Sequence, residues 1–315
     1  GPPGSGKTSV ANNLWSVLGD IEVVEGCPMN CAPAEPSCPW CQDRKARGET
    51  LRSTKLTAAQ RMVKVQGSGG LMVEDLIGDL DPEAALRKGI YSPEAFLPGK
   101  LLKANRGILL IDFVDRVPER VLNVIMYAVQ GGTIAIGALE QNIELDTLVI
   151  ATGGEDTLKG LPLDFIDNFD VARLGYVEDE AKQARIVRSR LNRKSSSVGD
   201  RALDKVITIV NETRHHAEVE RGIGTRGLIR NAEYLAHLPD LKPAQEDELL
   251  AAAASVSLPH RLKLAAEVDL PGKREEIIEE IVDKVTGAVR VSEELATLTK
   301  EDVLALVEEI AREDK

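Results

Sequence analysis

Aromatic residues and long apolar runs are what this sequence has least of. Phe, Trp and Tyr account for only 3% of the 315 residues, although hydrophobic residues as a whole make up 43%. The core must therefore be built mainly from aliphatic side chains. No apolar run is long enough to span a membrane and no signal peptide is visible, so we expect a cytoplasmic protein without a membrane segment.

Acidic residues outnumber basic residues, which argues against nucleic acid as a general partner. Lys and Arg number 39 against 51 Asp and Glu, giving a formal net charge of −12. General binding to nucleic acid favours a basic surface facing the phosphates, so we expect none. The length allows one large or two modest domains. Because residue 1 already lies inside a motif, we also expect that an N-terminal portion is missing.

The first eight residues, GPPGSGKT, match the phosphate-binding pattern G-x-x-x-x-G-K-[ST]. Glycines let the backbone N–H groups point at phosphate oxygens, Lys7 reaches the β- and γ-phosphates, and the Thr8 hydroxyl is a ligand for Mg²⁺. A chance Lys-Thr pair in a Gly/Pro turn is the alternative interpretation. The pattern predicts a site for ATP and Mg²⁺, with the cofactor-binding residues Gly1, Pro2, Pro3, Gly4, Ser5, Gly6, Lys7 and Thr8.

Two aliphatic segments further along predict parallel strands. GILLID, residues 107–112, is typical of a buried strand that ends in a metal-linked carboxylate, here Asp112. The alternative is that Asp112 merely starts a turn. TLVIATGG, residues 147–154, is a second aliphatic run that ends in small residues. Together they predict an α/β fold in which a parallel sheet is flanked by helices and carries the site at its carboxyl edge.

Three segments carry a resemblance to a known family. Residues 74–107 read EDLIGDLDPEAALRKGIYSPEAFLPGKLLKANRG, residues 224–227 read GTRG, and residues 258–264 read LPHRLKL. These segments resemble the magnesium-chelatase ATPase subunit, whose AAA+ branch also contains MoxR-type chaperones and MCM helicases. A PrkA-type kinase shares the ANRG segment. The resemblance covers about residues 1–265.

The resemblance implies a P-loop NTPase core of the AAA+ kind with a C-terminal helical lid. It implies a homo-oligomeric ring, a partner protein with a metal site of the von Willebrand A type, and ATP hydrolysis coupled to remodelling of a partner or to metal insertion. In GTRG, Arg226 would sense the γ-phosphate; the alternative is a solvated residue at a helix start. The expected domains are the core at 1–178 with a Cys-rich loop at 27–41 and a hairpin at 131–146, the lid at 179–265, and C-terminal helices at 266–315.

The chain departs from this family pattern at three catalytic positions. Phe113 stands where a glutamate would polarise water, Gly154 where an asparagine would hold it, and Asn168 where an arginine would reach a neighbouring subunit. An arginine finger alone contributes roughly 10³ to 10⁵ in rate. We therefore expect Mg-ATP binding with slow hydrolysis, which makes a hydrolysis-deficient scaffold subunit or a PrkA-type kinase-related module the alternatives.

Some residues could compensate for these departures. Asp115 would share the side of Phe113 if the strand continued for two residues, and Arg173 or Arg185 could replace the missing arginine. The candidate catalytic residues are therefore Asp112, Asp115 and Arg226.

All four cysteines fall in one short segment, CPMNCAPAEPSCPWC, with the spacing C-x₃-C-x₆-C-x₂-C. Four thiolates in a proline-rich loop can close a tetrahedral structural Zn²⁺ site. Free thiols, redox pairs and an iron–sulfur cluster remain open as alternatives, although disulfides are rare in a reducing cytosol. The candidate zinc ligands are Cys27, Cys31, Cys38 and Cys41.

Overall fold

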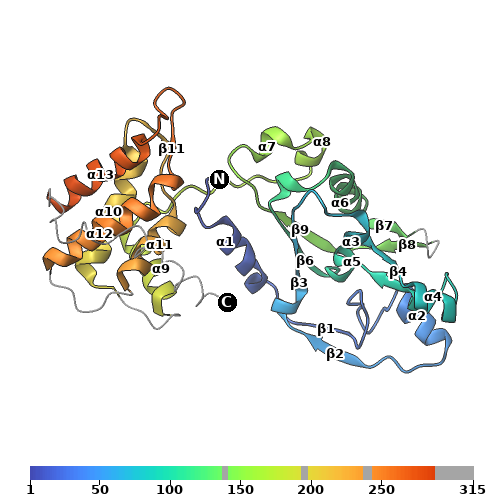
Figure 1. Ribbon diagram of the computed structural model, residues 1–315. Coiled ribbons are helices and arrows are strands. Elements are labelled where there is room, and N and C mark those ends of the chain that lie inside the picture. The colour runs from blue at the N-terminus through green and yellow to red at the C-terminus, as the bar shows by residue number, and fades with distance from the viewer. Residues whose placement is uncertain (137–140, 193–197, 237–242, 288–315) are drawn as a thin grey trace. The chain divides into compact units, whose positions relative to one another are not determined.

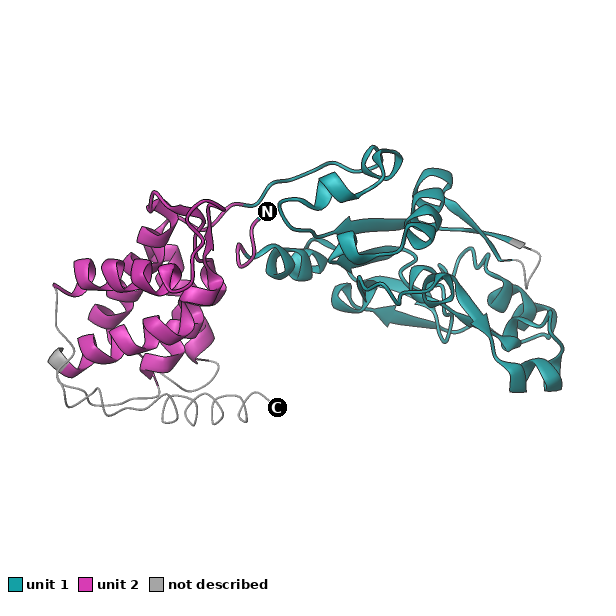
Figure 2. Ribbon diagram, turned by 45° about the horizontal axis from the view of Figure 1, so that its top comes forward, with its two compact units in different colours: residues 1, 6–174 teal, residues 2–5, 175–315 magenta. Residues whose placement is uncertain are grey.

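The computed structural model describes residues 1–136, 141–192, 198–236 and 243–287. These residues form two compact units (Figure 2). Unit 1 consists of Gly1 and Gly6–Leu174, and unit 2 of Pro2–Ser5 and the described residues from Gly175 onward. The division after Leu174 lies near the boundary that the sequence places at residue 178.

A three-stranded parallel sheet lies at the centre of unit 1 (Figure 1). Its order is β3 (Met62–Gln66), β6 (Gly107–Asp112), β9 (Thr147–Ala151). The four aliphatic residues of the central strand, at positions 108–111, are each at most 1% exposed. Such a continuous buried run is what a parallel strand covered on both faces requires.

Alternate residues of β6 face two different groups of neighbours. Ile108 and Leu110 pack with Ala11 of the first helix. Leu109 and Ile111 pack in the larger core, which contains Ile125 of the long helix α6. The sheet therefore has helices on both faces, as the sequence predicts for an α/β fold.

The helices of unit 1 are short except for α6. The α-helices are α1 (Lys7–Asn13), α2 (Pro39–Ala46), α3 (Val73–Ile77), α4 (Pro82–Lys88), α5 (Lys100–Lys103), α6 (Glu119–Gly131), α7 (Thr157–Gly160) and α8 (Leu163–Ile166). Single 3₁₀ turns are η1 (Leu14–Val17), η2 (Ala58–Arg61), η3 (Pro93–Ala95) and η4 (Val114–Arg116).

The described residues of unit 1 also form three antiparallel strand pairs. They are β1 (Ile21–Val24) with β2 (Ser53–Leu56), β4 (Gly78–Leu80) with β5 (Phe96–Pro98), and β7 (Thr133–Ile136) with β8 (Gln141–Glu144). The β7–β8 pair lies within the range predicted for a hairpin insert. The predicted tip of that hairpin, residues 137–140, lies outside the described residues.

Unit 2 is mainly helical and has a core of its own. Among its described residues, helix α10 packs against four other helices and supplies buried aliphatic residues such as Val206 and Val210. The helices are α9 (Glu180–Asn192), α10 (Asp200–His215), α11 (Thr225–Ala236), α12 (Pro243–Ser257) and α13 (Lys273–Thr286). A 3₁₀ turn, η6 (Pro259–Arg261), and the antiparallel pair β10 (Val219–Arg221) and β11 (Lys263–Leu264) complete it.

The beginning of the predicted C-terminal region belongs to this helical core. Ile277, Ile278, Ile281 and Val282 of α13 are nearly inaccessible and pack in the same cluster as α10. Residues 288–315 of that region lie outside the described part of the chain. The predicted class, a parallel α/β core followed by a helical unit, is confirmed.

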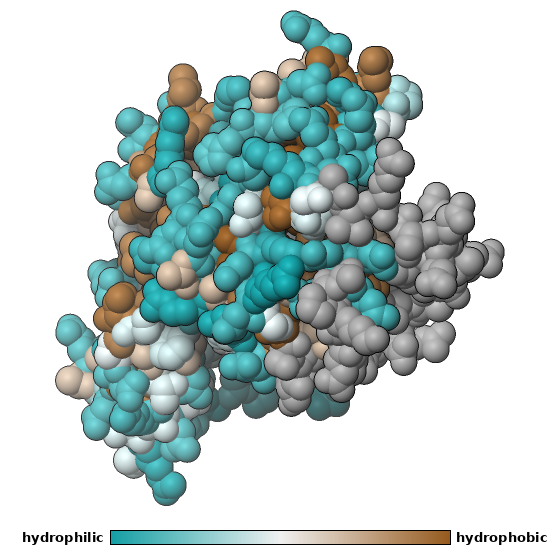
Figure 3. Space-filling model, turned by 90° about the vertical axis from the view of Figure 1, so that its left-hand side faces the viewer, coloured by the Kyte–Doolittle hydropathy of each residue, from teal (hydrophilic) through white to brown (hydrophobic). Residues whose placement is uncertain are grey.

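The face of the molecule in Figure 3 is mainly polar where it is coloured. In the view of Figure 3 most of the coloured residues are hydrophilic and hydrophobic ones are scattered. In the described part of the chain, no helix combines the length and the apolar character that crossing a membrane requires.

Gly67 marks a close approach that we expect to be essential for the sheet. Its amide donates to the Asp112 carbonyl at 2.7 Å, and a Cβ at this position would lie 2.0 Å from the Phe113 carbonyl oxygen. Gly67→Ala should therefore lower the free energy of unfolding by about 1–3 kcal/mol in urea titrations. Gly69→Ala is the matched control, because a Cβ there meets nothing within 4 Å. Equal stability of the two variants would contradict the prediction.

Candidate functional site

The phosphate-binding pattern forms a loop that turns through two left-handed glycines. Gly4 has φ +80° and Gly6 has φ +94°, a conformation that side chains with a Cβ rarely adopt. Helix α1 begins directly after Gly6, at Lys7. The Lys7 ammonium donates to the Gly1 carbonyl at 2.6 Å. The loop is therefore curled back on itself, as a phosphate cradle has to be.

The predicted pair of metal-linked residues meets at the carboxyl edge of the sheet. The Thr8 hydroxyl donates to Asp112 Oδ1 at 3.0 Å, although the two residues are 104 positions apart in the chain. Asp112 is the last residue of β6 and is half-buried. A hydroxyl and a carboxylate are oxygen ligands of the kind that Mg²⁺ prefers, so the donor set fits this ion.

A second hydroxyl reaches the same carboxylate oxygen. The Thr152 hydroxyl also donates to Asp112 Oδ1, and its backbone N–H donates to the Ile111 carbonyl at 2.8 Å. Thr152 is the first residue after β9, and the pairing of Ile111 with Ala151 brings it beside Asp112. Sequence reasoning missed this residue. Its position directly after the second aliphatic run, at the same sheet edge as Asp112, could have indicated it.

The chain turns sharply after Asp112. Phe113 has φ 57° and ψ 57°, a left-handed conformation that is unusual for a bulky side chain. Its ring lies 4.8 Å from the guanidinium carbon of Arg116, and the Val114 N–H donates to the Thr152 carbonyl at 3.0 Å. The residue that replaces the expected glutamate therefore belongs to a strained turn next to the metal-linked carboxylate.

Asp115 lies in this turn and not on a strand. It would share the side of Phe113 only if β6 continued, and β6 ends at Asp112. That condition is not met, because the left-handed Phe113 interrupts the extended backbone directly after Asp112. The exposed Asp115 carboxylate accepts a hydrogen bond from the Thr157 hydroxyl at 3.2 Å.

The other departures lie in connecting segments of unit 1. Gly154 lies two residues beyond Thr152 and has no side chain that could hold a water molecule. The Asn168 side-chain amide donates to the Asp164 carbonyl at 2.6 Å, which satisfies the end of the short helix α8. The proposed substitute Arg173, like Arg185 in unit 2, is exposed.

A cationic pocket lies within unit 2. It has a volume of about 190 Å³, and the Thr225 N–H donates to the Gly4 carbonyl at 3.0 Å at its edge. The predicted sensor, Arg226, lines this pocket at the start of α11. The complete lining is Pro3, Gly4, Tyr176, Arg221, Gly222, Gly224, Arg226, Gly227, His260 and Arg261.

Positive charges crowd this pocket. Burial, together with the neighbouring Arg230 and Arg226, lowers the pKa of Arg261. Burial and then Arg261 lower the pKa of His260, which favours its neutral form at neutral pH. Such crowding favours binding of an anion. His260 and Arg261 lie in the LPHR segment that carries part of the family resemblance, but the sequence predicted no role for their side chains.

Tyr176 on the pocket wall is held by a half-buried arginine. The Tyr176 hydroxyl donates to the Gly222 carbonyl at 2.9 Å, and the guanidinium of Arg214 lies 4.6 Å from the centre of its ring. Arg214 also donates to the carbonyls of Ile223 and Val177, at 2.9 and 3.0 Å. These contacts come from residues far apart in sequence, so no local motif could have indicated them.

The four predicted zinc ligands come together in unit 1. Their sulfur atoms all lie within 4.8 Å of one another, and all four residues are buried free thiols. Hydrogen bonds from the Cys31 and Cys38 thiols hold the pKa of Cys27 well below its usual range. The pKa of Cys41 is raised by burial and by the negative charge on Cys27. The donor set suits a thiophilic metal ion.

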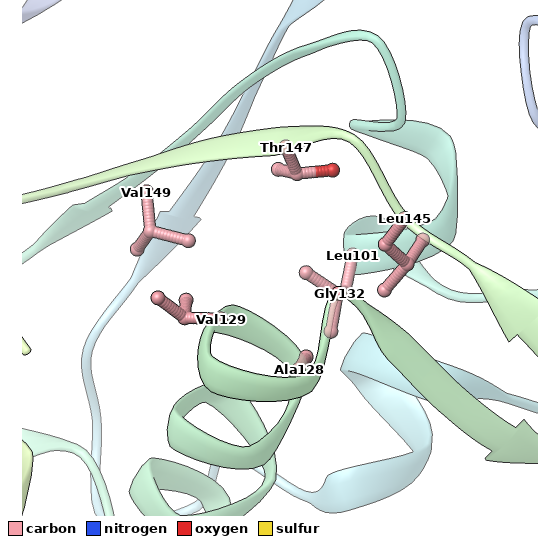
Figure 4. Close-up of a pocket in the computed structure, with 7 residues that line it drawn as sticks. All are labelled: Leu101, Ala128, Val129, Gly132, Leu145, Thr147 and Val149. Carbon is pink, nitrogen blue, oxygen red and sulfur yellow. The ribbon is translucent and has the colours of Figure 1, made fainter.

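A second, smaller cavity in unit 1 has a different character (Figure 4). Its volume is about 40 Å³, which holds little more than a water molecule. Its lining is apolar except for Thr147, so it offers no charged group to a phosphate or a metal ion. The residues are Leu101, Ala128, Val129, Gly132, Leu145, Thr147 and Val149.

Two solved structures are similar to this chain only at low TM-scores. One is a model of the complex between subunits BchI and BchD of magnesium chelatase, with a TM-score of 0.40, 20% identity, and coverage of 90% of this chain and 89% of that one. The other is NtrX from Brucella abortus with ADP, with a TM-score of 0.45, 16% identity, and coverage of 79% and 58%. Both TM-scores are below 0.5, so we draw no conclusion about fold or function from either similarity.

Sequence comparison gives clearer relatives, although no protein-family model matches the chain. A magnesium-chelatase subunit ChlI homologue of Methanocaldococcus jannaschii is 34% identical over 187 residues, which are 58% of this chain and 49% of that protein. Chloroplastic ChlI of Oryza sativa subsp. indica is 31% identical over 194 residues, with 60% and 45% covered. ChlI-2 of Arabidopsis thaliana is 28% identical over 193 residues, with the same coverage.

The chain thus spans about half the length of the curated relatives that it matches. Over some three-fifths of its own length it is similar to magnesium-chelatase subunits of the ChlI type, which confirms the predicted resemblance.

Proposed function

We propose that this chain binds Mg-ATP and works as a nucleotide-dependent subunit of the AAA+ ATPase class. The observation that carries this proposal is the Thr8–Asp112 hydrogen bond at 3.0 Å. It joins the end of the phosphate-binding loop to the acidic end of the central strand, which is how P-loop proteins hold their metal ion. The ChlI relatives support the same class.

Each part of the site has a proposed task. The backbone from Gly1 to Gly6 and the Lys7 ammonium would bind the phosphates, while Thr8 and Asp112 would hold Mg²⁺ directly or through water. When bound, Mg-ATP supplies the phosphoanhydride bond and a cation that neutralises its oxygens. Thr152 fixes the orientation of the Asp112 carboxylate by its hydroxyl.

Unit 2 contributes a separate set of cations. Arg226 lines a pocket with Arg221 and Arg261, and the three charges favour an anionic group there. We propose that Arg226 responds to the terminal phosphate of ATP, as the resemblance implies.

Hydrolysis by the chain alone should be slow. Phe113 can neither accept a proton nor orient water, Gly154 has no side chain, and the Asn168 amide already donates to a helix carbonyl. Asp115, the remaining candidate base, is exposed and accepts a hydrogen bond from Thr157. A loss of about 4 kcal/mol in transition-state stabilisation is roughly a thousandfold in rate.

We further propose that the chain assembles into a homo-oligomeric ring in the cytoplasm. There it would couple nucleotide binding to the remodelling of a partner protein with a von Willebrand A-type metal site, or to metal insertion. The strained Phe113 turn favours the second candidate, a nucleotide-gated scaffold that does not hydrolyse ATP. Transfer of labelled phosphate to protein would instead support the PrkA-type kinase alternative.

The binding proposal is tested by removing the lysine charge. Lys7→Ala should abolish ATP binding in calorimetry, because the ammonium group that faces the phosphates is lost. Lys100→Ala, which removes an exposed lysine from the same unit, should leave the affinity unchanged. Undiminished binding by Lys7→Ala would show that the loop is not the phosphate site.

Thr152 should affect the metal-dependent part of binding. Thr152→Val removes a hydrogen bond to the Asp112 carboxylate, and should weaken Mg-ATP binding about tenfold while leaving ATP binding in EDTA unchanged. Thr152→Ser keeps the hydroxyl and serves as the control. A loss that is equal with and without Mg²⁺ would mean that Thr152 serves only the fold.

The hydrolysis proposal is tested by restoring the missing groups. Phosphate release at saturating ATP should be slow for the unmodified chain, and Phe113→Glu alone should change it little. The triple variant Phe113→Glu/Gly154→Asn/Asn168→Arg should be markedly faster if subunits assemble, because the water-orienting and charge-neutralising groups are then present. Rapid hydrolysis by the unmodified chain that Asp115→Asn removes would overturn the proposal and make Asp115 the base.

A further inference from the structure

The four-cysteine segment has the geometry of a closed metal site. All four sulfur atoms lie within 4.8 Å of one another, and those of Cys27 and Cys38 are 3.5 Å apart. Four sulfurs placed about 2.3 Å from a tetrahedral Zn²⁺ are separated by roughly 3.8 Å. The cluster is therefore already close to the size that a zinc ion requires.

Backbone groups in the segment are oriented to stabilise thiolates. The Cys31 N–H donates to the Cys27 sulfur, and the Cys41 N–H donates to the Cys38 sulfur, both at 3.4 Å. Hydrogen bonds from N–H groups favour the charged form of an acceptor. One sulfur in each half of the segment, that of Cys27 and that of Cys38, therefore accepts a backbone hydrogen bond that favours its negatively charged form.

Regular secondary structure does not hold this segment in place. Between the end of β1 at Val24 and the start of α2 at Pro39, the chain forms neither helix nor strand. Ordering such a stretch costs roughly 1–2 kcal/mol of backbone entropy per residue. A metal ion that joins both ends of this loop would offset part of that cost.

The loop in turn holds the segment that leads into β6. The Asn30 side-chain amide donates to the carbonyls of Lys103 and Asn105, both at 3.0 Å. The Asn105 side chain donates to the Met29 carbonyl at 2.8 Å, and Arg106 donates to the Asn30 carbonyl at 2.9 Å. Met29 and Asn30 lie between the first two cysteines, so the cysteine cluster fixes the part of the loop that makes these contacts.

Two residues at this junction have left-handed backbones. Asn30 has φ 52° and Arg106 has φ 59°. Such conformations persist only where the surroundings over-determine them. The junction therefore depends on a rigid loop.

We propose that Cys27, Cys31, Cys38 and Cys41 bind one structural Zn²⁺, and that this ion positions residues 103–106 at the start of β6 through Met29 and Asn30. All four ligand positions are filled by protein sulfur, so the site leaves no coordination position for catalysis. This inference does not depend on the proposed ATP binding.

Metal analysis of the whole chain, purified without chelators, tests the first part. We expect about one Zn²⁺ per chain, four thiols that become titratable when it is released, and a tetrahedral thiolate spectrum after replacement by Co²⁺. Cys41→Ser should lose the ion, whereas Glu35→Gln, an exposed change in the same loop, should retain it. Four titratable thiols without metal, a disulfide, or bound iron with sulfide would each overturn the proposal.

The second part is tested without disturbing the ligands. Asn30→Ala should still hold about one Zn²⁺ per chain but should melt at a lower temperature. Because Asn30 is the proposed link, a chelator should lower the melting temperature of Asn30→Ala less than that of the unmodified chain. Fully additive effects of chelator and substitution would show that the ion does not act through this contact.

Discussion

One carboxylate oxygen organises the centre of unit 1. Oδ1 of Asp112 accepts hydrogen bonds from Thr8 at the start of α1 and from Thr152 at the end of β9. These residues come from three separate parts of the chain and meet because parallel strands end at the same edge of the sheet. The buried aliphatic residues of β6 hold the strand in the core. The polar site forms at Asp112, the first residue of the strand that is not fully buried.

In the proposed function, the residue after Asp112 separates nucleotide binding from hydrolysis. Binding relies on the loop and on Asp112, whereas hydrolysis would need a group that orients water at position 113. The left-handed Phe113 turns the chain away, so that the next acid, Asp115, pairs with Thr157. The close approach of Gly67 to the Phe113 carbonyl helps to fix this turn. On our proposal, the chain therefore responds to a nucleotide more than it consumes it.

The two ends of β6 have different constraints. At its carboxyl end Asp112 faces the phosphate-binding loop, and at its amino end residues 103–106 contact Met29 and Asn30 of the cysteine loop. The same segment belongs to the block that resembles the chelatase subunit. The family-like block thus contacts a loop that its resemblance did not imply, the loop that carries the four thiols.

The sequence by itself determined the phosphate-binding loop, the buried strand ending in Asp112 and the cysteine set, because each depends on residues close together in the chain. The spacing of the cysteines did not show whether their sulfur atoms meet, and the structure places all four within 4.8 Å of one another. Only the tertiary structure placed Thr152 on Asp112, because the register between two strands far apart in the chain decides which side chains meet. Likewise, the turn at Phe113 depends on the close approach of Gly67, and the pocket around Tyr176 depends on the half-buried Arg214. These contacts join distant segments, so their geometry follows from packing.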